Sequence, residues 1–488
     1  MLPNHQPTEH TTPAPAAYRK PAVLGLNLSL AALQAALPQP ELPERPALVA
    51  LYWRCWELAA QKVRHGSAEN GFSATYIDAA FGGNIFQWDT CFIAAFARYS
   101  RELLPVLPAL DNFYRLQEPD GYIAREYRWE NGAPLWAKPS GDSINPPLFA
   151  WAEWQLYRIH ADRTRLSNVW PHLDGYFRYL QRVHRNHDGT YWITDMGSGM
   201  DNTPRYGAGW LDLTCQQALN ARMLALIAQE IDNTLAVEWY TAQHRELAAV
   251  INSRMWDAET GWYWDVDTAG LAIMQQTIAN FWPLLADVTS DAQTAQLVAH
   301  LRDPATFWRT HPFPTLAANH VSYRPHGEYW LGAVWAPTNY MVIKGLEHTG
   351  QHELAREATL RHLDAIERVY RTTDTVWENY RADEDAPGTP ARPDFVGWTG
   401  CGPIALLIEQ VIGVLVDAPQ RRIQWTLREP GAHGLRNLPF GADTVDLVVD
   451  DAGKLSVHTT GELTLVIDGQ RGSATFSLAP GAHTLSLT

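Results

Sequence analysis

The sequence predicts a mainly α-helical protein, an (α/α)6 barrel followed by a small C-terminal antiparallel β-sandwich. Between residues 46 and 415, apolar residues recur at three- and four-residue spacing in helix-length segments. From about Asp417 the pattern changes to short segments of period-two alternation, separated by Gly- and Asp-containing turns. We therefore expect a disordered tail at 1–19, a barrel domain at 20–416 and a β-sandwich accessory domain at 417–488.

Helical segments account for most of the chain. A short apolar run at 28–37 comes first, and the longer helices are expected near 46–65, 89–100, 102–117, 143–161, 166–185, 210–231, 235–256, 274–286, 289–302, 329–348, 351–371 and 398–415. Short and long connections alternate between them, which favours helical hairpins closed into a ring with the long loops at one mouth. A stacked solenoid is the weaker alternative, because no repeat of fixed period is visible.

The C-terminal segment has no cluster of residues that would form a catalytic site. Strands are expected at 422–427, 444–449, 454–459, 463–467, 473–478 and 483–487. We interpret this part as an accessory domain, with a carbohydrate-binding role as the alternative.

Composition limits the classes of partner. A net charge of −15 argues against nucleic acid and against an anionic membrane, since both are bound by clustered Lys and Arg. The chain has 21 Trp and 19 Tyr, more than core packing requires, although most of these rings must be core. Because aromatic rings commonly stack on sugars in binding sites, a small carbohydrate is the expected substrate.

The cysteine pattern and the N-terminal sequence favour a cytoplasmic location. Residues 1–17 lack the charged-then-apolar pattern of a signal peptide, and no run of 18 apolar residues is present. Cys55, Cys91, Cys215 and Cys401 are far apart and show no zinc-ligand spacing, so we expect them to be reduced and buried. No metal and no cofactor are expected.

Two carboxylates in unusual loops are the candidate catalytic pair. Asp201 lies in Gly197–Arg205, a loop of small, turn-forming residues between two helices; taken alone, this segment favours a structural turn or helix cap over a catalytic role. Glu378 lies between Trp377 and Asn379 in the segment 376–380, where neighbouring rings would desolvate it and raise its pKa; a surface glutamate is the alternative. Glycosidic cleavage needs two carboxyl groups across the sugar, so we assign Asp201 and Glu378 to these roles.

Three further loop-to-helix junctions resemble these two in their Gly, Pro, Trp and acidic residues. In the first, at 82–89, Asp89 is either a helix cap or an acceptor for sugar hydroxyls. We expect these three junctions and the loops of Asp201 and Glu378 to lie together at one mouth of the barrel. The expected substrate-binding residues are Phe86, Trp88, Asp89, Asp142, Asn145, Asn202, Arg205, Glu328, Tyr329, Trp330, Trp335, Trp377, Tyr380 and Trp398.

Taken together, GSGMDNTPR, VWENY, GGNIFQWDTCF, DSINPPLFAWAEWQLY and GEYWLGAVWAPTNYMVIKGL resemble the inverting α-glycosidases with an (α/α)6 barrel. These are glycoside hydrolase family 63, with its processing glucosidases and mannosylglycerate hydrolases, and the related trehalases of family 37. The resemblance implies that Asp201 is the general acid and Glu378 the general base. It also implies that Trp88, Asp89 and Trp330 form the first sugar subsite, with Arg205 nearby.

One departure from the family concerns the leaving group. Many relatives have YWRGPIW where this chain has Leu331 in place of the Arg, so a preference for an anionic aglycone does not follow. Arg125, Arg128, Arg205 or Arg324 are the available replacements. Two other functions fit the same barrel: a sugar 2-epimerase or isomerase that uses His residues, for which His311, His320 and His326 show no obvious pairing, and a non-catalytic sugar-binding protein.

Overall fold

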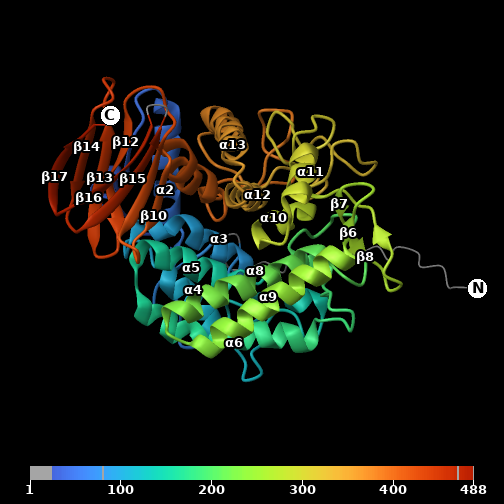
Figure 1. Cartoon of the computed structure of the whole chain (residues 1–488). Helices are drawn as coiled ribbons and strands as arrows, with labels where there is room; N and C mark the ends of the chain where they lie inside the picture. Colours follow the sequence, from blue (N-terminus) through green and yellow to red (C-terminus); the bar gives the residue numbers. More distant parts are fainter. Residues whose placement is uncertain (1–24, 80–81, 470–471, 487–488) are drawn as a thin grey trace, which may run out of the picture.

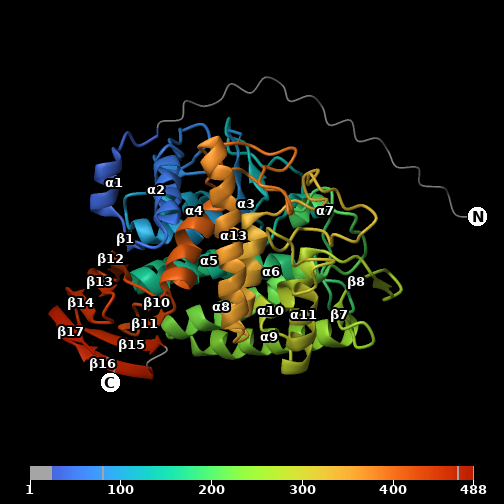
Figure 2. The same cartoon turned by 90° about the horizontal axis from the view of Figure 1, so that it is seen from above.

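The structure is a computed structural model that describes residues 25–79, 82–469 and 472–486. The tail predicted at 1–19 lies outside the described residues. A large helical part and a smaller strand-rich part lie side by side (Figures 1 and 2). The chain is therefore mainly helical with a strand-rich C-terminal region, as expected.

The helices follow the predicted segments closely. Their bounds are α1 Leu30–Ala36, α2 Pro46–Ala60, α3 Gln87–Ala97, α4 Val106–Arg115, α5 Phe149–His160, α6 Arg163–Val183, α7 Asp195–Ser198, α8 Leu211–Glu230, α9 Thr234–Arg254, α10 Trp282–Ala286, α11 Asp291–Leu301, α12 Ala336–His348 and α13 His352–Thr373. Short 3₁₀ segments at Arg98–Ser100, Gly141–Ser143, Ile278–Phe281 and Thr399–Cys401 adjoin them, and a π-helical segment, η5, spans Gly402–Ile412. Each predicted helical range contains helical residues.

α5 and α12 begin six and seven residues later than predicted, and each delay has a local cause. α5 begins at Phe149 because Pro146 and Pro147 keep the preceding residues extended. α12 begins at Ala336 instead of 329, because Tyr329 has a positive φ that a right-handed helix excludes. Both delays lengthen loops that carry candidate site residues.

Six helical segments contact one another in a closed order: α3 packs on α5, α5 on α8, α8 on α10, α10 on α12, and α12 and α3 both pack on η5. The helices α4, α6, α9 and α13 pack on members of this ring. The candidate loops directly precede α3, α5, α8 and α12, so they meet at the N-terminal ends of the ring helices.

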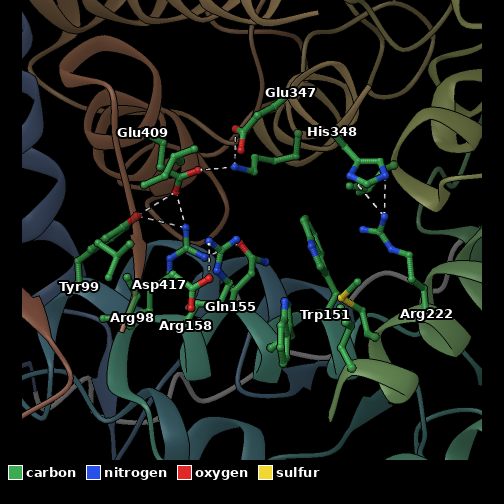
Figure 3. A pocket seen from close by; sticks show the side chains of 18 residues that line it. Arg98, Tyr99, Trp151, Gln155, Arg158, Arg222, Glu347, His348, Glu409 and Asp417 are labelled. Carbon is green, nitrogen blue, oxygen red and sulfur yellow. Dashed lines mark hydrogen bonds and ion pairs between the residues drawn. The ribbon is translucent and has the colours of Figure 1, made fainter. Parts of the chain in front are cut away.

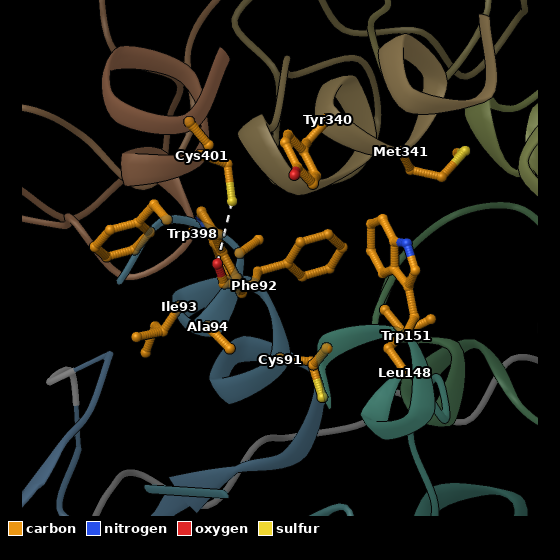
Figure 4. Close-up of a cluster of buried hydrophobic side chains, with 14 of the residues drawn as sticks. Cys91, Phe92, Ile93, Ala94, Leu148, Trp151, Tyr340, Met341, Trp398 and Cys401 are labelled. Atoms are coloured by element: carbon orange, nitrogen blue, oxygen red, sulfur yellow. Dashed lines mark hydrogen bonds between the residues drawn. The ribbon is translucent and has the colours of Figure 1, made fainter. Parts of the chain in front are cut away.

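The core of the ring is apolar. Phe92 on α3, Trp151 on α5 and Tyr340 on α12 are buried together, and the Cys401 thiol donates to the Phe92 carbonyl at 3.2 Å (Figure 4). Burying such large side chains is the main favourable term in folding. All four cysteines are free and buried, as predicted.

The strands form two larger sheets and several two-stranded ladders. Their bounds are β1 Gln39–Glu41, β2 Val63–Arg64, β3 Tyr76–Ile77, β4 Ile85–Phe86, β5 Glu126–Tyr127, β6 Trp256–Asp257, β7 Trp262–Tyr263, β8 Asp265–Val266, β9 Ala272–Ile273, β10 Val414–Asp417, β11 Arg422–Leu427, β12 His433–Phe440, β13 Asp443–Val449, β14 Leu455–Thr459, β15 Leu463–Gly469, β16 Gly472–Leu478 and β17 Gly481–Leu485. The larger sheets have the orders β1-β12-β13-β14-β17 and β10-β11-β15-β16.

The strand-rich part corrects the prediction in two ways. β11 and β15 pair in parallel, so this part is not purely antiparallel. The strand β12 was missed because a bulge between Leu435 and Leu438 and the positive φ of Asn437 break the period-two pattern. β1, from a segment assigned to the helical domain, pairs with β12. The division at 416/417 stays a prediction. Within the described ranges, no helix carries an apolar stretch long enough to cross a bilayer.

Candidate active site

A short helix and two glycines hold the loop that carries Asp201. The hydroxyl of Thr194 caps α7 by accepting the N–H of Gly197 at 3.1 Å. Gly199 ends α7 with a φ of 81°, and a Cβ at this position would lie 2.5 Å from the Trp88 ring. Both the left-handed conformation and the close approach therefore require glycine here.

Asp201 is partly exposed and lies beside a cation. Its loop closes in a turn in which the N–H of Thr203 donates to the Met200 carbonyl at 3.0 Å. The side chain is 27% exposed, and its Oδ1 lies 3.5 Å from Nη2 of Arg125. Desolvation raises the pKa of Asp201 to about 6, although Arg125 opposes the shift.

Glu378 is fixed by bonds at both of its backbone groups. Its N–H donates to the Arg392 carbonyl at 2.9 Å, and its carbonyl accepts the indole N–H of Trp398 at 3.0 Å. The same segment pairs with the loop before α12, because Tyr380 and Val334 exchange backbone hydrogen bonds. The position of the Glu378 side chain is therefore set by elements on both sides.

The Glu378 carboxyl group is buried, at 2% exposure, and holds its proton more tightly than usual. Its pKa is raised to about 7, mainly by burial and also by the charge of Asp201, whereas Arg392 and a hydrogen bond from the Tyr329 hydroxyl favour the ionised form. Asp201 and Glu378 thus influence each other electrostatically. Two carboxyl groups with pKa values near neutrality can act as proton donor and acceptor at physiological pH.

Tyr329 lies close to both carboxyl groups because of a strained turn. Gly327, Glu328 and Tyr329 have consecutive positive φ values of 95°, 37° and 70°. Left-handed backbone at two non-glycine residues is costly and occurs mainly where function requires it. Of the three, Glu328 was predicted to bind substrate, but its carboxylate is half exposed and pairs with Arg324 at 3.3 Å.

Asn202 joins the Asp201 loop to this turn. Its side-chain nitrogen donates to the Glu328 carbonyl at 2.8 Å, and its oxygen accepts the Trp330 N–H at 2.9 Å. The amide of Asn202 is therefore used on backbone groups, which suits a positioning role, and its predicted part in substrate binding stays a prediction.

Four of the predicted tryptophans form one cluster. The rings of Trp330 and Trp335 stack with their centroids 3.9 Å apart and their planes 5° apart. Trp88 contacts Trp330 at 5.8 Å and Trp398 at 5.9 Å, and Trp335 contacts Trp398 at 5.4 Å. All four rings are buried. Tyr329 packs edge-on against Trp335, so the cluster holds Tyr329 in place.

Asp89 is a third carboxyl group near this cluster. It lies in the first turn of α3, not at its cap position, which Phe86 occupies. The side chain is buried, and its Oδ1 has no hydrogen-bond partner among the described residues. Burial, the charge of Asp78 and the charge of Glu378 raise its pKa well above the ordinary value.

Asn145 and Asp142 connect the other loops. Asn145 donates to the Gly197 carbonyl at 2.9 Å and accepts the Trp88 N–H at 3.4 Å, which links three candidate loops. Asp142 accepts a hydrogen bond from the Thr194 hydroxyl. Both residues lie at the predicted mouth, with their polar atoms bonded to the protein.

Arg205 does not lie free to bind substrate. Its guanidinium bonds Asp265 through Nε at 2.9 Å and Nη2 at 3.0 Å, and Asp212 through Nη1 at 2.6 Å. It is buried and also lies over the Trp210 ring. Two aspartates already satisfy this cation, which favours a structural role, and its predicted part in substrate binding stays a prediction.

The remaining candidates lie at the edge of the cluster or beneath it. Phe86 is half-buried in β4, paired with Glu126 of β5. Trp377 directs its indole N–H to the Thr373 hydroxyl of α13 at 3.1 Å. Tyr380 is buried, and its hydroxyl accepts the Trp377 N–H at 2.9 Å. Trp377 and Tyr380 therefore shape the Glu378 segment.

A histidine pair that the sequence did not reveal lies under Tyr380. His311 and His362 are 2.7 Å apart, between Nε2 and Nδ1, and both are buried. Burial lowers the pKa of both imidazoles, so they are neutral. Their burial keeps them from acting on a sugar in this conformation.

Sequence reasoning underrated Arg125 and missed Asp265. Arg125 was considered only as a partner for an anionic leaving group, yet it is the cation beside Asp201 and its Nη1 is buried without a hydrogen-bond partner in the described part of the chain. Asp265 lies 60 residues from Arg205. No local pattern signals such a pairing.

Comparison with known proteins agrees with this chemistry. The family model for the mannosylglycerate hydrolase MGH1-like glycoside hydrolase domain matches residues 83–399. An uncharacterized protein of Borreliella burgdorferi is 29% identical over 377 residues, covering 75% of this chain and 79% of the relative. A periplasmic trehalase of Escherichia coli is 25% identical over 176 residues, which is 34% of this chain and 29% of the trehalase.

Solved structures share the fold. The GH63 mannosylglycerate hydrolase from Thermus thermophilus, in complex with glucose, matches with a TM-score of 0.58 and 20% identity over 72% of this chain and 99% of that chain. A GH78 family rhamnosidase of Bacillus sp. GL1 matches with a TM-score of 0.62 and 14% identity over 88% of this chain and 42% of that chain.

Proposed function

Because the chain belongs to the mannosylglycerate hydrolase MGH1-like glycoside hydrolase family, it is a glycoside hydrolase, and we propose that it cleaves a small α-glucoside or α-mannoside with inversion. The observation that carries this proposal is the pair Asp201 and Glu378, which approach Tyr329 from separate loops and both have raised pKa values. The closed order of ring helices supports an (α/α)6 barrel as the scaffold.

The proposed reaction is a single displacement. Protonated Asp201 donates its proton to the glycosidic oxygen while Glu378 accepts a proton from the water that attacks the opposite face of the anomeric carbon. The partial exposure of Asp201 suits a group that meets the leaving portion, and the burial of Glu378 suits a base enclosed with one water. An exo-acting, α-glucosidase-like enzyme of the cytoplasm is the form of this proposal that we favour.

The decisive measurement is the anomeric configuration of the first product. Proton NMR during cleavage of α-glucosides and α-mannosides should show the β-anomer before mutarotation. An α-anomer at early times would exclude inversion. Release of a new reducing end also separates hydrolysis from epimerisation of a free sugar and from binding without turnover.

Two variants test the assignment of the carboxyl groups. Asp201→Asn and Glu378→Gln should each lower kcat by about 10²–10⁴-fold, the usual contribution of a general acid or base. Glu384→Gln, which changes an exposed carboxylate, is the matched control and should retain full activity. Near-normal turnover by a folded Asp201 or Glu378 variant would remove that residue from the mechanism.

A further inference from the structure

A cavity with several charged side chains lies at the opposite ends of the ring helices. It has a volume of about 490 Å³, and its lining comes from α5, the C-terminal halves of α8 and α12, the end of η5, strand β10, the two residues after α3 and one residue of α10. Trp88, beside the candidate active site, and Arg98, in the lining of the cavity, lie at opposite ends of α3. Ten residues of an α-helix span about 15 Å. The cavity is therefore distinct from the candidate active site, and its size suits a small organic molecule.

The cavity has an excess of hydrogen-bond donors. Among the buried side-chain atoms without a partner in the described ranges, those that belong to the lining residues are all nitrogens: Arg98 Nε, Gln155 Nε2, Arg158 Nε and Arg222 Nε. Arg98 and Gln155 are themselves more than nine-tenths buried. A ligand that completes these bonds must therefore supply acceptors.

The carboxylates of the lining already bind neighbouring donors, and Asp417 pairs with Nη2 of Arg158 at 3.5 Å. Glu409 accepts from Tyr99 at 3.1 Å, from Lys344 at 2.8 Å and from Arg98. Glu347 accepts from Lys344 at 2.6 Å, and also from a glutamine outside the lining. Burial alone would raise the pKa of Glu409, but the charges of Lys344 and Arg98 outweigh it and hold this pKa below its usual value, so the carboxylate stays ionised and paired.

The charged and aromatic side chains of the lining restrict the class of ligand further. Four cationic side chains, Arg98, Arg158, Arg222 and Lys344, line the cavity with three carboxylates, Glu347, Glu409 and Asp417, and Arg222 also pairs with Asp287 at 3.3 Å. Figure 3 shows Arg98, Gln155 and Glu409 on one side, Arg222 with His348 on the other, and Trp151 between them. Trp151 and Trp154, together with Leu226 and Leu285, supply apolar surface for the body of the ligand.

We propose that this cavity binds a small organic oxyanion with a sugar-sized body, either a sugar phosphate or a sugar acid. The oxyanion accepts from the donors around Arg98, Gln155 and Arg158, as charge-assisted hydrogen bonds require. The ring of the sugar lies against the tryptophan side. Nothing in this proposal depends on the reaction at Asp201 and Glu378.

The test is isothermal titration of the full chain with glucose 6-phosphate, gluconate, glucose and inorganic phosphate. Glucose 6-phosphate or gluconate should bind at one site per chain, and glucose should not bind at this site. Added NaCl should weaken the binding of the sugar anion. Binding of the phosphate ester alone identifies a sugar phosphate as the ligand, and binding of gluconate alone identifies a sugar acid.

Matched variants locate the binding. Arg158→Gln and Trp154→Leu change partly exposed cavity residues and should each weaken binding about tenfold, the effect of one charge-assisted bond or of a lost ring contact. Arg163→Gln, an exposed arginine outside the cavity, should bind like the wild type, and so should Asp201→Asn. Failure of both sugar anions to bind, or binding that both cavity variants leave unchanged, would overturn the proposal.

Discussion

The side chain of Asn202 accepts the N–H of Trp330 at 2.9 Å and donates to the carbonyl of the residue two positions earlier at 2.8 Å. One amide thus connects the loop of the proposed acid to the turn that places Tyr329. The two loops are 128 residues apart in the chain. The ring of Trp88 also contacts both segments, whereas Asn202 supplies direct hydrogen bonds between them.

Asn202→Ala should therefore impair catalysis more than folding. Without the amide, the Asp201 loop and the Tyr329 turn lose their register, and a displacement of about 1 Å can cost about 10²-fold in rate. We expect kcat to fall by about that factor with an unchanged melting temperature. Asn131→Ala, at an exposed loop asparagine, is the control. Full activity of Asn202→Ala would show that the loops hold their positions without it.

The pH dependence of kcat/KM should be bell-shaped with its maximum between about pH 6 and 7. The reaction needs a protonated Asp201, whose pKa is about 6, and an ionised Glu378, whose pKa is about 7. Because the two groups interact, the flanks belong to the pair and not to either residue. Activity that rises steadily to pH 9 would contradict this pairing.

Arg125→Gln should move the acidic flank of that profile upward. The Arg125 guanidinium lies 3.5 Å from the Asp201 carboxylate and lowers its pKa. Without the cation, the pKa of Asp201 approaches that of Glu378, so the inactive, doubly protonated pair persists to higher pH, and we expect the acidic flank to rise by about half a pH unit or more. Arg178→Gln removes an exposed arginine on α6 and should leave the profile in place. An unshifted flank in Arg125→Gln would show that Asp201 does not sense this charge.

Glu378→Gln should stabilise the fold, and more so at alkaline pH. The folded state raises the pKa of this carboxyl group from 4.5 to about 7, so it binds the proton more tightly than the unfolded chain. The wild type then loses stability as pH rises through this range, by up to about 3 kcal/mol at pH 8 for a buried group. Glutamine has no charge to desolvate and avoids this loss.

Urea unfolding at pH 4.5 and pH 8 measures the difference. The gain of Glu378→Gln over the wild type should be small at the lower pH and large at the higher one. The exposed Glu384→Gln variant should show no such trend. An equal gain at both pH values would mean that packing, not ionisation, is responsible.

Arg205→Met should destabilise the protein strongly. It would leave the buried carboxylates of Asp212 and Asp265 without their cation, which typically costs about 3–5 kcal/mol. The matched change at an exposed pair, Arg178→Met beside Asp174, should cost less than about 1 kcal/mol. A raised KM with unchanged stability would instead support the predicted role of Arg205 in substrate binding.

Sequence periodicity predicted the helices well because each presents its own apolar face. α12 shows where this reasoning stopped: the residues before Ala336 look helical by pattern, but the backbone at Glu328 and Tyr329 is left-handed. Tertiary contacts of the turn, such as the bonds from Asn202, override the local preference. The loop that holds Tyr329 could only be found in the structure.

The candidate site shows the same limit. Asp201 and Glu378 stood out because their surroundings were rich in turn residues and aromatic rings, and both have the raised pKa values expected of reactive acids. Arg205 lies in the same loop as Asp201, yet its partner Asp265 is distant in the sequence. A charged residue in a promising motif can serve substrate or structure, and only its partners distinguish these roles.

The pairing of β1 with β12 also constrains how the chain is made. Residues 39–41 leave the ribosome long before their partner strand at 433–440 is synthesised. The edge of that sheet therefore stays open while the helical ring forms, and domains are most prone to misassembly during such intervals. Truncation before β12 would leave an unpaired strand on an otherwise complete ring, so expression of the ring alone should begin after Glu41.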